Sequence, residues 1–157
     1  MTVQIKKADI IDVTFGENVT IIQPVNLYGC TIGDNSFIGP FVEIQRDASI
    51  GKNTRIQSHA FICELVTIGD HCFISHGVMF INDLFKSGGP AGPDRAKWKK
   101  TTIGNHVSIG SNATILPVTI ADNVVIGAGS VVTKDIIKSG IYAGNPAKFL
   151  RKIGAPK

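Results

Sequence analysis

A large apolar residue recurs every six positions through the middle of this chain. Nine consecutive hexads carry it at the same place: Ile32, Ile38, Ile44, Ile50, Ile56, Ile62, Ile68, Ile74 and Phe80. A helix needs apolar residues every three or four positions, and a half-buried strand needs them at every second position, so neither element alone explains the period. Repeats of six residues are typical of a parallel β-helix, in which short strands joined by tight bends wind into a coil. We therefore predict an all-β solenoid whose axis is filled by these side chains.

The hexads also predict which residues stack. Three hexads make one triangular coil, so residues 18 apart in the sequence are expected to lie on adjacent coils at the same corner. The pattern stops at Leu84, resumes at Ile103, and shifts by one residue between Ile115 and Ile120. We therefore expect one shorter bend near Pro117.

Composition narrows the class of protein. The 157 residues fit one domain, and an apolar content of 43% is ample for a core. The net charge of +4 is modest, and the basic clusters at 95–100 and 148–157 are not interleaved with aromatic residues as in a nucleic-acid-binding protein. These clusters are interpreted either as solvated surface or as partners for the phosphates of an anionic cofactor.

The cysteines and the N-terminus favour a cytoplasmic protein. Cys30, Cys63 and Cys72 form no CxxC motif, and Cys30 and Cys72 fall in the small inward-facing register. Buried, reduced thiols are therefore expected rather than a disulfide or a metal site. The N-terminus lacks an apolar run of signal-peptide length, and no apolar stretch reaches 18 residues.

The long gap in the hexads divides the chain. We expect a β-helix domain over residues 1–138, with its first coil near Glu17–Ile21, and an external loop at residues 85–102. Insertions in solenoids often line the binding face, although a mobile decoration is the alternative. Residues 139–157 are expected to cap the open end of the coil as a tail, with a short helix over Phe149–Ile153.

Polar residues at one corner suggest a site. Arg46, Glu64 and Asn82 are spaced by 18 residues, so they are expected to form a ladder, and Asp83 follows directly before the loop. Two carboxylates and an amide gathered under a loop suit recognition of an amine or of sugar hydroxyls. Plain solvation of polar bend residues is the alternative.

A histidine lies one corner away from this ladder. His76 follows its aliphatic residue, Ile74, by two positions, so it is expected to meet the ladder only across a subunit interface. It is a candidate general base, and an inert exposed histidine is the alternative. The prism shape of such a coil invites threefold packing of subunits.

Three histidines and a glycine-rich tract have structural explanations that compete with functional ones. His59, His71 and His76 invite a zinc interpretation, but their different offsets from the hexad aliphatics place them at different positions, so we expect no metal. The glycine-rich tract at residues 126–131 lacks the βαβ context of a dinucleotide-binding fingerprint. Its small residues serve tight bends and also leave room for a flat ligand.

The chain resembles the hexapeptide-repeat acyltransferases from about residue 17 onward. The resemblance rests on the hexads, the mid-chain loop and the motifs VVTKD at 131–135 and AGNPAK at 143–148. It implies a left-handed β-helix, which periodicity alone does not establish. It also implies homotrimers with acetyl-CoA bound between neighbouring subunits.

The segments FICE at 61–64 and FISHGVMFIND at 73–83 are most similar to bacterial nucleotide-sugar N-acetyltransferases. Those enzymes acetylate the 3-amino group of a dTDP- or UDP-linked 3-amino-3-deoxy sugar made for lipopolysaccharide or S-layer glycans. The resemblance implies active-site roles for Glu64, Asn82 and Asp83, with His76 as a reserve base.

The resemblance also suggests how the ligands would be held. The pantetheine arm of CoA would pass the small residues of the later coils, Gly110, Gly127 and Ala128. The phosphates of CoA would meet Lys134 and either Lys148 or Arg151. Arg46, Arg95 and Trp98 would help to shape the nucleotide-sugar pocket. The alternatives are a sugar O-acetyltransferase that needs His76 as its base, a zinc hydratase resembling gamma-type carbonic anhydrases, and a non-catalytic scaffold.

Overall fold

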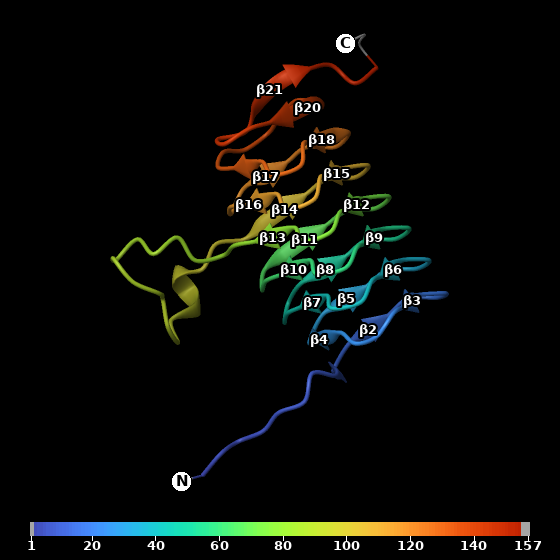
Figure 1. Ribbon diagram of the computed structural model, residues 1–157, viewed down its shortest axis with the longest axis vertical. Helices are drawn as coiled ribbons and strands as arrows, with labels where there is room; N and C mark the ends of the chain where they lie inside the picture. Colours follow the sequence, from blue (N-terminus) through green and yellow to red (C-terminus); the bar gives the residue numbers. More distant parts are fainter. Residues whose placement is uncertain (1, 155–157) are drawn as a thin grey trace.

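The computed structural model describes residues 2–154, and most of them form a left-handed parallel β-helix with three sheets (Figure 1). The first sheet contains β1 (Ile10–Ile11), β4 (Asn26–Tyr28), β7 (Glu43–Ile44), β10 (Phe61–Ile62), β13 (Met79–Phe80), β16 (Thr114–Ile115) and β19 (Val131–Val132). The second sheet contains β2 (Thr14–Phe15), β5 (Thr31–Ile32), β8 (Ser49–Ile50), β11 (Val66–Ile68), β14 (Thr101–Ile103) and β17 (Thr119–Ile120). The third sheet contains β3 (Thr20–Ile21), β6 (Phe37–Ile38), β9 (Arg55–Ile56), β12 (Phe73–Ile74), β15 (Ser108–Ile109), β18 (Val124–Ile126), β20 (Gly140–Ala143) and β21 (Lys148–Arg151).

The predicted register of the coil is confirmed. Ile62 on β10 pairs with Ile44 on β7, and Ile74 on β12 pairs with Ile56 on β9, each pair 18 residues apart. The predicted shortening near Pro117 is also confirmed, because β16 ends at Ile115 and β17 ends at Ile120.

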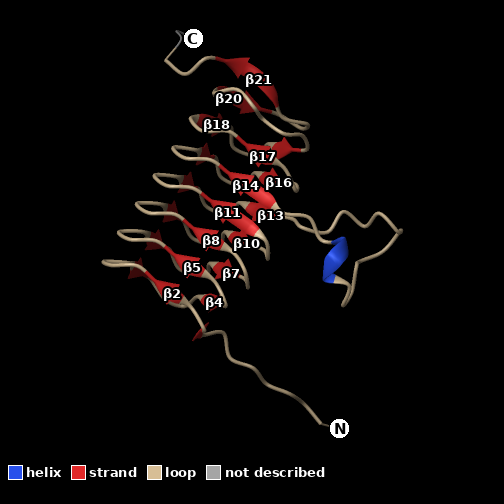
Figure 2. Cartoon of the chain, turned by 180° about the vertical axis from the view of Figure 1, so that it is seen from behind, coloured by secondary structure: helices blue, strands red, loops and turns tan. Residues whose placement is uncertain are grey.

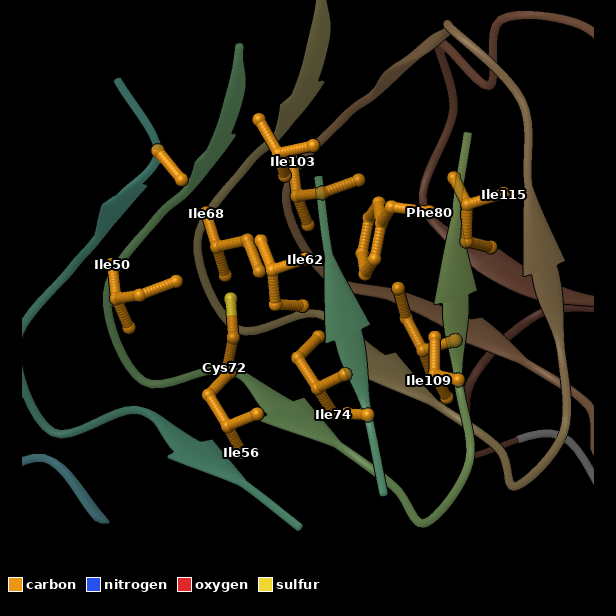
Figure 3. Close-up of a cluster of buried hydrophobic side chains, with 14 of the residues drawn as sticks. Ile50, Ile56, Ile62, Ile68, Cys72, Ile74, Phe80, Ile103, Ile109 and Ile115 are labelled. Carbon is orange, nitrogen blue, oxygen red and sulfur yellow. The ribbon is translucent and has the colours of Figure 1, made fainter. Parts of the chain in front are cut away.

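The hexad aliphatics fill the axis of the coil (Figure 3). Ile50, Ile56, Ile62 and Ile68 are at most 1% exposed, and Phe80 occupies the same register at 1%. Each buried aliphatic side chain contributes roughly 1.5–3 kcal/mol. The expected state of the cysteines is confirmed, since all three are buried and free.

Two predictions about the ends of the coil are wrong. The coil begins at β1, where Ile10 pairs with Leu27, rather than near Glu17–Ile21. The closing segment is the strand β21, not a helix, and it pairs antiparallel with β20, with Ala143 opposite Lys148. It therefore satisfies the outer hydrogen-bonding edge of the third sheet with strand pairing. Residues 155–157 of the predicted tail lie outside the described residues.

The three corners of the coil are named here by the sheets that they join. The first corner runs from the first sheet to the second, the second corner from the second sheet to the third, and the third corner back to the first. Between β13 and β14 the chain leaves the first corner as a long loop that stands off one side of the coil (Figures 1 and 2). The loop contains the 3₁₀ helix η1 (Arg95–Lys97), whose N-terminus is capped by the Asp94 side chain.

Candidate active site at the first corner

The first corner stacks the predicted ladder. Glu43 on β7 and Met79 on β13 both pair with Phe61 on β10, so the three strands bring Arg46, Glu64 and Asn82 to the same corner in adjacent coils. The side-chain amide of Asn82 donates to the backbone carbonyl of Glu64 at 3.3 Å. The two residues that were expected to act together therefore lie in direct contact.

The loop returns to this corner through Arg95. One guanidinium nitrogen of Arg95 pairs with Asp47 at 2.8 Å and also with the carboxylate of Glu64. The Glu64 side chain is only 15% exposed, so this contact places a cation on a largely buried carboxylate. The guanidinium also lies 5.7 Å from the ring centroid of Trp98. A hydrogen bond to Asp47 is the main cause of the raised pKa of Arg95, followed among favourable causes by the charge of Glu64.

Sequence reasoning did not predict a role for Asp47. Its only signal is its place directly after Arg46, at a backbone conformation with a φ of 60°. That positive φ belongs to the bend and gives no hint that a residue 48 positions later will pair with the carboxylate.

Asp83 faces the loop rather than the ladder. Its two carboxylate oxygens accept the backbone N–H groups of Ala91 at 2.7 Å and Phe85 at 2.9 Å. These two hydrogen bonds, from Ala91 first, hold the pKa of Asp83 below its ordinary value. The loop is fixed at its other end as well, because the N–H of Lys99 donates to the carbonyl of Asn82 at 2.9 Å. Asp83 therefore organises the loop that covers the ladder.

The third corner carries the other candidate group. The Nδ1 atom of His76 lies 2.8 Å from the hydroxyl of Ser58, one coil below. Gly110, Gly127 and Ala128 follow at the same corner on later coils. A Cβ at Gly110 would stand 2.4 Å from the backbone nitrogen of Ala128, so the close approach of coils requires glycine there.

The expected phosphate-binding cations do not gather in one chain. Lys134 follows Val132 of β19 and so lies at the first corner, whereas Lys148 opposite Ala143 lies at the third-corner end of β21. Arg151 pairs with Ile141 at the opposite end of the same hairpin. Only Lys148 therefore lies beside the glycines of the third corner.

The histidines occupy separate places. The rings of His71 and His106 stack at 4.9 Å at the second corner, while His59 lies against Phe41 at the third corner. Residues 2–154 contain no group of three or more histidine, cysteine or acidic side chains arranged to hold a metal ion. Within that same range, no helix is long and apolar enough to cross a membrane.

Comparison with known proteins identifies the repeats. Residues 29–64 match the family described as bacterial transferase hexapeptide (six repeats), and residues 100–134 match the hexapeptide repeat of succinyl-transferase. These matches and the left-handed coil show that the chain is built from the hexapeptide repeats of bacterial transferases.

Relatives of known activity use both nitrogen and oxygen acceptors. Galactoside O-acetyltransferase from Escherichia coli (strain K12) is 38% identical over an alignment of 133 positions. The alignment covers 78% of this chain and 64% of the relative. A second similar protein is a variant of AntD, an N-acyltransferase from Bacillus cereus, whose structure contains dTDP and coenzyme A. It is 26% identical, with a TM-score of 0.78, and the match covers 88% of this chain and 83% of the AntD chain. A hexapeptide-repeat acetyltransferase from Vibrio cholerae O1 biovar eltor, whose structure contains acetyl coenzyme A, is 26% identical with a TM-score of 0.67. That match covers 81% of this chain and 72% of the Vibrio chain.

The lengths of the curated relatives differ from that of this chain. The chain spans 64% of the galactoside O-acetyltransferase and 32% of the bifunctional GlmU protein of Clostridium beijerinckii.

Proposed function

We propose that this chain is an N-acetyltransferase that moves an acetyl group from acetyl-CoA to a nucleotide-linked sugar. The proposed acceptor is the 3-amino group of a dTDP- or UDP-linked 3-amino-3-deoxy sugar used in surface glycans such as lipopolysaccharide. The observation that carries the proposal is the contact of Asn82 with Glu64 beneath the basic loop. The complex of AntD with dTDP and coenzyme A supports it.

In the proposed reaction, the neutral amine attacks the thioester carbonyl of acetyl-CoA. A C–N bond forms, the C–S bond breaks, and the leaving thiolate takes up the proton that the nitrogen releases. Glu64 accepts a hydrogen bond from the amine and so orients its lone pair. The side-chain amide of Asn82 has two N–H groups, of which one is used by the Glu64 carbonyl, and the second stabilises the negative charge on the carbonyl oxygen.

The loop completes this arrangement. Arg95 neutralises Glu64 in the free protein, and the acceptor takes over this contact when it binds. Asp83 contributes through the loop that it holds, while Arg95 and Trp98 line the approach of the nucleotide sugar. Arg46, one coil below Glu64, lies further along the same approach.

We further propose that a homotrimer completes the site. His76 and Asn82 lie at different corners of one chain, and a threefold assembly would bring the third corner of one subunit beside the first corner of the next. The pantetheine arm of acetyl-CoA would then run along the third corner past Gly110, Gly127 and Ala128, with Lys148 near its phosphates.

Replacement of the ladder residues tests this proposal. We expect Glu64→Ala and Asn82→Ala each to lower kcat/KM at least tenfold, which is about 1.4 kcal/mol of transition-state stabilisation. The assay measures release of free thiol with a panel of amino-sugar nucleotides. Glu17→Ala, which removes an exposed carboxylate from the second corner, is the matched control and should behave as wild type. Wild-type turnover in both ladder variants would remove Glu64 and Asn82 from the mechanism.

A second candidate function is transfer to a sugar hydroxyl. It is favoured by the contact of His76 with Ser58, which fixes the imidazole ring and leaves Nε2 as a possible base, and by the similarity to galactoside O-acetyltransferase. A hydroxyl is far less acidic than an ammonium group, so this reaction depends on a base. Loss of activity in His76→Ala with full activity in Glu64→Ala would establish O-acetylation in place of N-acetylation.

A further inference from the structure

The loop between β13 and β14 encloses a cavity of its own. This cavity has a volume of about 260 Å³ and is lined mainly by residues from the two arms of the loop, among them Asp83, Lys86, Ser87, Gly89, Lys97 and Lys99. Ligand pockets for drug-sized molecules span ~300–1,000 Å³. The cavity therefore suits one small polar group of a ligand rather than a whole nucleotide sugar.

The positive charge of the protein is concentrated around this cavity. Residues 84–100 carry five lysine or arginine side chains and one acidic residue, Asp94, an excess that equals the net charge of +4 of the whole chain. Three of the five cations, Lys86, Lys97 and Lys99, line the cavity. Like charges held around one space repel one another unless an anion offsets them.

Little in the protein neutralises these lysines. Lys97 lies 3.7 Å from Asp94, whereas Lys86 and Lys99 form no ion pair with any residue between 2 and 154. Asp83 also lines the cavity and its negative charge interacts with Lys97, but it forms no ion pair with a lysine because both of its oxygens accept backbone N–H groups of the loop. The lysine side chains are therefore available to a ligand.

The backbone around the cavity is open as well. No atom lies within 4 Å of the position that a Cβ would take at Gly88 or Gly89. The N–H of Gly88 already donates to the Phe85 carbonyl at 2.8 Å, whereas the Ser87 hydroxyl lines the cavity and offers a donor that suits phosphate oxygens. The cavity also adjoins the ladder, since Asp83 follows Asn82 directly and the N–H of Lys99 is bonded to the carbonyl of Asn82.

We propose that this cavity binds the diphosphate group of a nucleotide-linked ligand through Lys86, Lys97 and Lys99. Both partners of the proposed reaction carry such a group: the nucleotide sugar has one between its sugars, and CoA has one next to its adenosine. The inference rests on the proposed function for these two candidate ligands, and the anion site itself is tested by binding alone, without turnover.

The test measures binding of inorganic pyrophosphate, dTDP, UDP and CoA by titration calorimetry. We expect Lys97→Gln and Lys99→Gln each to weaken pyrophosphate binding about tenfold, and the triple variant K86Q/K97Q/K99Q to abolish it. Lys100→Gln is the matched control, because Lys100 neighbours Lys99 in the sequence and does not line the cavity. Added salt should weaken pyrophosphate binding to the wild type more than binding to Lys97→Gln, which has lost one of the three cations.

The ligands distinguish the two sources of the diphosphate. Loss of dTDP or UDP binding with unchanged CoA binding in the triple variant assigns the cavity to the acceptor, and the reverse assigns it to the acyl donor. Wild-type binding of all four ligands by the triple variant would overturn the proposal, as would an equal loss in Lys100→Gln. If no amino sugar accepts an acetyl group but pyrophosphate still binds in a lysine-dependent way, the proposed function is wrong and the anion site is still supported.

Discussion

The first and second corners of the coil carry polar residues at the same spacing but use them differently. At the second corner, Asp70 accepts the backbone N–H of Lys52 at 2.7 Å, and its own N–H donates to Asn105 at 2.8 Å. The same contact recurs one coil further, where Asp122 accepts the N–H of Asn105 at 2.7 Å. Each carboxylate or amide oxygen there joins one coil to the next.

At the first corner, the two carboxylates beneath the loop turn away from the stacked backbone, although Asp135 further along the coil accepts the N–H of Thr119 at 2.7 Å. The Glu64 carboxylate meets Arg95 of the loop rather than a backbone N–H of a neighbouring coil, and Asp47 does the same. A polar ladder alone is therefore no evidence of a site. Its side-chain oxygens must be left unused by the stacking of the backbone.

The largest effect that tests this comparison is expected at a second-corner glycine. A Cβ at Gly104 would stand 2.3 Å from the Asp122 carboxylate and 2.7 Å from its backbone nitrogen, so Gly104→Ala forces two coils apart. We expect a loss of about 3 kcal/mol in the free energy of unfolding, measured by urea denaturation. Gly89→Ala in the open loop is the control and should leave the midpoint unchanged; equal midpoints for both variants would contradict the steric argument.

The second prediction separates stability from activity. Asp70→Ala removes the acceptor of the exposed N–H of Lys52 and should cost about 0.5–1.5 kcal/mol of stability while the folded protein keeps the kcat/KM of the proposed reaction. Glu64→Ala should show the opposite, with a stability change below about 0.5 kcal/mol and a turnover loss of at least tenfold. The comparison breaks if Glu64→Ala destabilises the coil as much as Asp70→Ala does.

A smaller effect is expected where the loop meets the first corner. Asp47 and Arg95 have side chains about half exposed, so water and salt screen their pair and it contributes little to stability. Asp47→Asn should leave the melting temperature nearly unchanged and increase the quenching of Trp98, the only tryptophan, by acrylamide. Asp34→Asn, which alters an exposed ion pair at the second corner, is the control and should not affect Trp98.

The smallest effect is expected at low pH, where protonation of Asp83 should loosen the loop. Because the N–H groups of Ala91 and Phe85 lower the pKa of Asp83, its contribution to loop structure is complete at neutral pH and is lost as pH falls through that lowered pKa. Trp98 emission, followed from about pH 6 to about pH 2.5, should report the loss in wild type. Asp83→Asn should lack this part of the transition, and an identical titration in the variant would show that Asp83 does not hold the loop.

The sequence predicts the coil better than its ends. From Ile32 to Phe80 the apolar period admits one register, so the stacking of Glu64 under Asn82 follows from counting. Before Ile32 the apolar spacing changes phase, because Ile32 follows Leu27 after five residues, so the first strands fall outside the unbroken run of hexads. The short run at 148–151 carries no period that separates a strand from a helix.

The contacts of the loop are not encoded in any repeat. Arg95 lies 31 residues from Glu64 and 48 from Asp47, separations that no periodic rule connects. The sequence predicts a basic loop at this corner, and its position between β13 and β14 is confirmed, while its function stays a prediction. It did not predict that Asp83 turns toward Ala91, because that contact depends on how a non-repeating segment folds back on itself.

The coil closes beneath the loop with its register unchanged. Val66 on β11 pairs with Thr101 on β14, and Ile68 with Ile103, as if the intervening residues were absent. In such an architecture the insertion does not take part in the stacking of the coils. One insertion can therefore be exchanged for another of different length without a change in the core. If the proposed function holds, loops exchanged at residues 81 and 100 with those of other hexapeptide-repeat acyltransferases should alter the acceptor while the coil stays the same.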